Sequence, residues 1–121
     1  MSYDNLRRDW HTRTVTIANG ASLSGEADLG GGRLVAVQIP PAWTAADITF
    51  AASSASGGTF GPVRDGAGTV LTLTGFAVNE VVYLSPNDTA GIRYIKVRSG
   101  TAGVPVNQGA DRVITLFVRP V

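Results

Sequence analysis

The sequence predicts an all-β fold, a single-domain antiparallel β-sandwich of about eight strands. From residue 14 onward, short runs rich in Val, Ile, Thr, Tyr and Phe alternate with clusters of Gly, Pro, Asn, Asp and Ser, which is the pattern of strands joined by turns. No long helical period is present, and the connections are too short for the crossover helices of a βαβ fold. A chain of 121 residues is expected to form one domain.

The first twelve residues differ from the rest, because their few apolar side chains follow neither a helical nor a strand period. We therefore interpret 1–12 as an extended N-terminal arm and 13–121 as the β-sandwich domain. The candidate strands of that domain are 13–18, 33–39, 47–52, 59–64, 69–74, 80–84, 92–98 and 112–119.

Alternation along two of these strands assigns one of their faces to the core. Leu71 and Leu73 alternate with threonines, so both leucines are expected to point inward and the threonines outward. Ile48, Phe50 and Ala52 form a similar inward set in an earlier strand.

The strand at 92–98 predicts a basic outer stripe with an aromatic residue at one end. Ile95 and Val97 share one face, while Tyr94, Lys96 and Arg98 share the other. The second face should meet water or a partner.

Two other runs, 34–37 and 113–118, are apolar on both faces. This is expected of strands that are covered on both sides. Either the N-terminal arm or a neighbouring subunit would provide the second cover.

The connections fit the same fold. Residues 65–68 predict a tight hairpin turn because Gly accepts the positive φ that such turns need, and 85–88 predict a second turn around Pro. The segments 30–32 and 53–58 are interpreted as flexible surface loops. Residues 43–47, which follow two prolines, are expected to form one helical turn.

Composition excludes several functional classes. Ten basic and nine acidic residues give a net charge of +1 with no block of like charge, which disfavours a nucleic-acid binder. The absence of Cys excludes a disulfide framework and a thiolate zinc site, and the single His excludes a multi-histidine metal site. The apolar runs are too short to cross a bilayer, and the first nine residues lack the apolar stretch of a secretion signal.

Few residues are candidates for catalysis. His11 is the one possible histidine base, and we favour a solvated or interface histidine over a catalytic one because the arm does not hold it against a partner. Glu26 and Asp28 lie two residues apart and could form an acid–base pair. Solvated loop charges are the favoured interpretation of both.

Other polar and aromatic residues also have simple structural interpretations. Asp65, Asn87 and Asp88 are oxygen donors, but they lack the spacing of a calcium loop and are better explained as turn residues. Trp43 and Tyr94 could stack on a sugar ring, although Trp43 is favoured as a core residue. The sequence thus predicts no catalytic, cofactor-binding or metal-binding residue.

Four segments carry a resemblance to a known group of proteins. RLVAVQIP at 33–40, WTAADITF at 43–50, IRYIKVRSGT at 92–101 and PVNQGADR at 105–112 resemble the small structural proteins of tailed-bacteriophage virions, over roughly residues 14–121. The resemblance implies a capsid decoration or cement protein of jelly-roll type, often a trimer. It would be made in the cytoplasm of the bacterial host and sit on the outer surface of the virion's capsid.

The partners implied are the major capsid protein and two further copies of the chain, with no nucleic acid, membrane or cofactor. A flexible arm that orders on a neighbouring subunit would add contact area at an entropic cost. The predicted partner interface comprises Tyr3, Leu6, Arg7, Arg8 and Trp10 of the arm together with Tyr94, Lys96 and Arg98 of the outer stripe.

Besides an unrelated β-sandwich interaction module, two alternatives remain open at this point. The first is a tail, fibre or head-fibre protein that helps adsorption to the host and binds glycans through Trp43 or Tyr94. The second is an enzyme, which would require a cleft that couples carboxylates such as Glu26 and Asp28.

Overall fold

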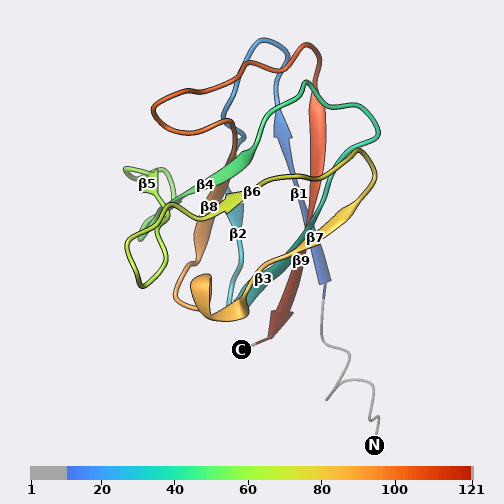
Figure 1. Ribbon diagram of the computed structural model, residues 1–121. Coiled ribbons are helices and arrows are strands. Elements are labelled where there is room, and N and C mark those ends of the chain that lie inside the picture. The colour runs from blue at the N-terminus through green and yellow to red at the C-terminus, as the bar shows by residue number, and fades with distance from the viewer. Residues whose placement is uncertain (1–10, 121) are drawn as a thin grey trace, which may run out of the picture.

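The computed structural model describes residues 11–120 and confirms the predicted all-β class (Figure 1). Two antiparallel sheets pack against each other around one apolar core. Sheet 1 has the order β1 (His11–Ile17), β9 (Arg112–Pro120), β3 (Gly32–Gln38) and β7 (Val81–Tyr83). Sheet 2 has the order β2 (Ala27–Asp28), β8 (Tyr94–Ser99), β4 (Ile48–Ser53) and β5 (Gly61–Pro62), and β6 (Thr72–Leu73) also pairs with β4.

The strand order is that of a jelly roll. β5 and β6 pair with two different halves of β4, so together they occupy one position beside it. Counted in this way, the first strand pairs with the last, the second with the one before the last, and so on inward to β4 and β5. A jelly roll is an antiparallel ribbon wrapped so that successive pairs alternate between two sheets. The implied jelly-roll architecture is therefore confirmed.

The inward faces predicted from alternation are confirmed. Ile48 and Phe50 are fully buried and Leu73 is nearly so, while Leu71 and Ala52 are half-buried and pack against the same core. Each fully buried aliphatic or aromatic side chain contributes about 1.5–3 kcal/mol of transfer free energy, so these five residues tie β4 and β6 firmly to the core.

Strand β8 alternates as predicted. Ile95 and Val97 are fully buried, whereas Tyr94, Lys96 and Arg98 are half-buried on the opposite, outer face of sheet 2.

Several boundaries differ from the predicted ones. β1 begins at His11, two residues earlier than expected, and the predicted strands at 59–64 and 69–74 shrink to the two-residue strands β5 and β6. β2 was not predicted, because two residues in a glycine-rich segment carry no alternation. The segment just before β2 is held to β8 by Ser24, whose Oγ accepts a hydrogen bond from the Val97 N–H at 2.9 Å.

The turns at 65–68 and 85–88 form as predicted. Gly68 N–H donates to the Asp65 carbonyl at 3.0 Å, and Pro86–Asp88 forms the single 3-10 turn η1 of the described chain.

The helical turn expected at 43–47 does not form. Instead, Thr44 N–H donates to the side-chain oxygen of Gln108 at 2.8 Å, and the Trp43 indole N–H donates to the Ala46 carbonyl at 3.1 Å. These bonds fix the segment as an irregular link against the β8–β9 connection.

Leu73 provides a test of the core. Replacing Leu73 with Ala removes a buried side chain next to Ile48, and we expect the free energy of unfolding to fall by about 2–5 kcal/mol. Urea unfolding measures this value. The matched control is Thr72→Ala, an exposed neighbour on the same strand, which should change stability by less than about 0.5 kcal/mol. Equal effects of the two substitutions would show that the assignment of faces is wrong.

Candidate docking surface

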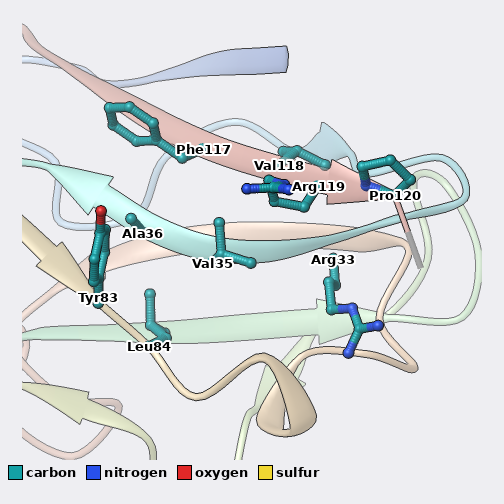
Figure 2. Close-up of a pocket in the computed structure, with 9 residues that line it drawn as sticks. All are labelled: Arg33, Val35, Ala36, Tyr83, Leu84, Phe117, Val118, Arg119 and Pro120. Atoms are coloured by element: carbon teal, nitrogen blue, oxygen red, sulfur yellow. The ribbon is translucent and has the colours of Figure 1, made fainter. Parts of the chain in front are cut away.

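The outer face of sheet 1 carries an open groove of about 760 Å³ (Figure 2). It runs along β3 between β9 and β7, and its walls come from all three strands. The lining is largely apolar, with two guanidinium groups. The lining residues are Arg33, Val35, Ala36, Tyr83, Leu84, Phe117, Val118, Arg119 and Pro120.

The groove exists because a small residue lies between two aromatic ones. Ala36 is paired with Phe117 on β9 and with Tyr83 on β7, and Figure 2 shows the two rings on either side of it. Directly opposed side chains on neighbouring strands have Cβ atoms about 5 Å apart. A methyl group flanked by two large rings therefore forms the floor of a hollow. Ala36 is fully buried yet lies outside the core cluster.

A β-bulge widens the apolar floor. The β3–β9 register shifts between Leu34 and Ala36, so Val35 is an extra residue on β3. A bulge of this kind re-aims side chains and interrupts the strict alternation of faces. Leu34 and Val37 remain in the core, while Val35 and Ala36 both line the groove.

Further apolar side chains extend this face beyond the groove. Tyr83 is 82% exposed, Val113 is 53% exposed and Val81 is 45% exposed, and their register with Ala36, Thr16 and Gln38 places them on sheet 1. No segment within residues 11–120 covers them. The predicted covering of 113–118 on both sides is therefore not supplied by this part of the chain, which makes this face a candidate interaction surface.

Two arginines stand at one end of the groove. Arg33 on β3 and Arg119 on β9 are direct cross-strand partners, and like charges opposite each other are destabilising. Within the described part of the chain, neither has an acidic partner, since the one ion pair there joins Arg93 and Asp28. This end of the groove is thus suited to a carboxylate.

The outer face of sheet 2 is more occupied than the sequence suggests. The Lys96 ammonium lies 4.5 Å from the centre of the Phe60 ring, and the Arg93 guanidinium lies 5.0 Å from that of Tyr94. Such cation–π contacts contribute about 0.5–1 kcal/mol at exposed sites. Arg98 has one terminal nitrogen buried without a hydrogen-bond partner in the described structure. The stripe is therefore partly covered by the chain itself, and the guanidinium of Arg98 is only partly accessible.

Glu26 holds the 53–58 loop against this side of the molecule. Its carboxylate accepts a hydrogen bond from the Ser56 hydroxyl and another from the Gly57 N–H at 2.8 Å. These bonds favour the charged form and hold the pKa of Glu26 below its ordinary value.

Asp28 has a different set of partners. It accepts hydrogen bonds from Arg93 at 3.0 Å and from the Gly30 N–H at 2.8 Å. The hydrogen bonds from Arg93 are the main cause, and the Gly30 bond the next, of a pKa of Asp28 below its ordinary value. Glu26 and Asp28 are thus each bound to separate structural partners.

The remaining predicted residues fall in different places. Tyr3, Leu6, Arg7, Arg8 and Trp10 lie outside the described residues. His11 lies at the start of β1, with its Nε2 buried and without a hydrogen-bond partner in the described structure.

Trp43 packs against the core, which agrees with its predicted role.

The groove on sheet 1 was not predicted from the sequence. Its one signal was the apolar run at 34–37, which shows apolar character on both faces but cannot reveal the bulge.

Among residues 11–120, no group of three or more metal-ligating side chains is close enough to hold a metal ion. No helix in the same range has the length and apolar character needed to span a membrane. No protein-family model matches the chain, and no curated protein or solved structure matches it significantly.

The Glu26 contacts predict a pH-dependent loop. Because the pKa of Glu26 is lowered in the folded state from 4.5, its stabilising effect is complete well above that value and is lost as the pH falls through the lowered folded pKa. Hydrogen exchange at the Gly57 amide measures this, and protection should decrease on acidification.

Glu26→Gln should accelerate exchange at Gly57 near neutral pH. The Ala67 amide, which donates to Asp65 in the other loop, is the internal reference for this variant and should not respond. Unchanged exchange at Gly57 would contradict the role of Glu26.

Proposed function

We propose that this protein is a bacteriophage capsid decoration protein, which binds the outer surface of the head as a homotrimer and stabilises the lattice of the major capsid protein. Support comes from the resemblance in four segments of the chain. The jelly-roll architecture that this resemblance implied is the architecture of the domain.

The groove on sheet 1 is the observation that carries the proposal. Its lining contains no His, Asp, Glu, Ser or Lys side chain, so it offers no general acid or base that titrates near neutral pH. Apolar side chains, an exposed tyrosine and arginines are instead the residue types enriched where proteins bind each other. A surface of this kind favours docking of a polypeptide.

A decoration protein needs many modest contacts rather than a reactive centre. It meets a preformed lattice, and joining several copies converts later contacts into intramolecular ones, which can raise overall affinity by about 10²–10⁴. On this proposal the outer stripe of sheet 2, with Tyr94, Lys96 and Arg98, faces the coat protein. Lys96 would bring positive charge to that contact.

One observation favours a second candidate function, host adsorption by a tail, fibre or head-fibre protein. Tyr83 is 82% exposed at the edge of the groove, so its ring is available to stack on a sugar. Trp43, which the sequence offered for this role, is packed against the core instead.

Electron cryomicroscopy of phage heads that lack the protein, incubated with the purified full chain, tests the proposal. We expect regular density on the outer shell at threefold or quasi-threefold positions. Bare shells, or density on the tail alone, would contradict the decoration role, and a glycan-binding screen would then test adsorption.

A charge variant locates the contact on the particle. Lys96→Gln removes a charge from the outer stripe of sheet 2, and we expect weaker, less salt-dependent attachment to heads with little change in stability. The matched control is Arg64→Gln, which removes one charge from the exposed 65–68 hairpin. Equal attachment of both variants would exclude the stripe from the contact.

A further inference from the structure

We propose that the groove on sheet 1 receives residues 1–10 of a second copy of this chain, so that neighbouring domains are joined by exchanged N-terminal segments. This inference rests on the groove being the protein-docking surface of the proposed function. It adds the identity of the segment that docks there.

One end of the groove lies close to the start of β1. Strand β1 begins at His11, which pairs with Val118, and Val118 and Pro120 line the groove. Figure 1 shows the start of β1 and the C-terminal end of β9 at the same end of the domain. The ten preceding residues span up to about 33 Å when extended. That length exceeds the span of a seven-residue strand such as β3.

The apolar side chains of residues 1–10 match the lining of the groove in character. Residues 1–10 include Tyr3, Leu6 and Trp10, which are apolar side chains suited to a floor of Val35 and Ala36. Burying such side chains in an apolar groove is favourable by roughly 25 cal/mol per Å².

The same ten residues carry two carboxylates, on Asp4 and Asp9, and two guanidinium groups, on Arg7 and Arg8. The groove ends at Arg33 and Arg119, which are cross-strand partners and have no acidic partner in residues 11–120. A carboxylate placed there would relieve the repulsion between the two cations, and an arginine can bind it through two parallel hydrogen bonds.

The direction of β1 favours a second copy over the chain's own groove. β1 runs from this end of the domain toward the opposite end, antiparallel to β9. To enter its own groove, the chain would have to reverse immediately before His11, and residues 6–10 contain no Gly or Pro and a single turn-favouring residue, Asp9. Continuing onto a neighbour needs no reversal.

When each copy's segment enters the groove of the next copy in turn, the contact is head-to-tail. Such contacts produce closed rings when the rotation between copies closes. The homotrimer of the proposed function would then be held by three identical contacts of this type.

Disulfide trapping tests the exchange, and the absence of cysteine from the chain makes it clean. Full-length chains carrying Leu6→Cys are mixed under reducing conditions with full-length chains carrying Val35→Cys, and the mixture is oxidised. We expect the mixed disulfide to form at least several-fold faster than with the control Thr72→Cys chain. Thr72 is exposed on sheet 2, so a cysteine there is at least as accessible as one in the groove.

Equal rates for the groove and the control positions would overturn the proposal. So would a single chain carrying both Leu6→Cys and Val35→Cys that closes an internal disulfide at dilutions where the mixed disulfide does not form. Both readouts are made without phage particles. If the mixed disulfide forms but phage heads stay bare, the exchange of segments stands and the decoration role is wrong. If the heads are decorated but no mixed disulfide forms, the decoration role stands and the exchange is wrong.

Discussion

The pairing of the first described strand with the last is the constraint on which the rest of this fold depends. β9 lies between β1 and β3, and its inward residues Ile114, Leu116 and Val118 are fully buried. Because contacts between β1 and β9 join residues about a hundred positions apart, they close the largest loop in the described chain, and that closure carries an entropic cost that local pairs avoid. The jelly roll is complete only when this pair forms, and the pair also places both ends of the described chain at one end of the domain.

The same strand links the core to the docking surface. Along β9, Val118 points into the core while the neighbouring Phe117 forms a wall of the groove. The connections of the jelly roll cross between the two sheets at their ends. No segment within residues 11–120 therefore crosses the outer face of sheet 1. On sheet 2 the situation differs, since Phe60 and the loop held by Glu26 lie against Lys96 and its neighbours. The outer face of sheet 2 is thus partly covered by the chain itself, and the outer face of sheet 1 stays open.

The sequence predicted the fold class and the inward faces because period-2 alternation is a local property that survives folding, as in β8. It did not predict β2, whose two residues are too few to show a period, nor the bulge at Val35, which depends on the register with β9. Gln108 was also missed. A glutamine between Asn and Gly reads as a surface residue, yet it is 1% exposed, and its amide bridges Thr44 and Ser99. The groove arises from cross-strand neighbours of Ala36, and a single sequence does not reveal which strands are neighbours.

On the proposal made here, the open face of sheet 1 joins copies of this chain. Sedimentation equilibrium of the purified full-length protein at micromolar concentrations tests it most directly, because it reports mass without a crosslinker, a tag or a phage particle. We expect a mass three times that of one chain, falling toward that of a single chain on dilution. The mass of a single chain at every concentration would contradict it.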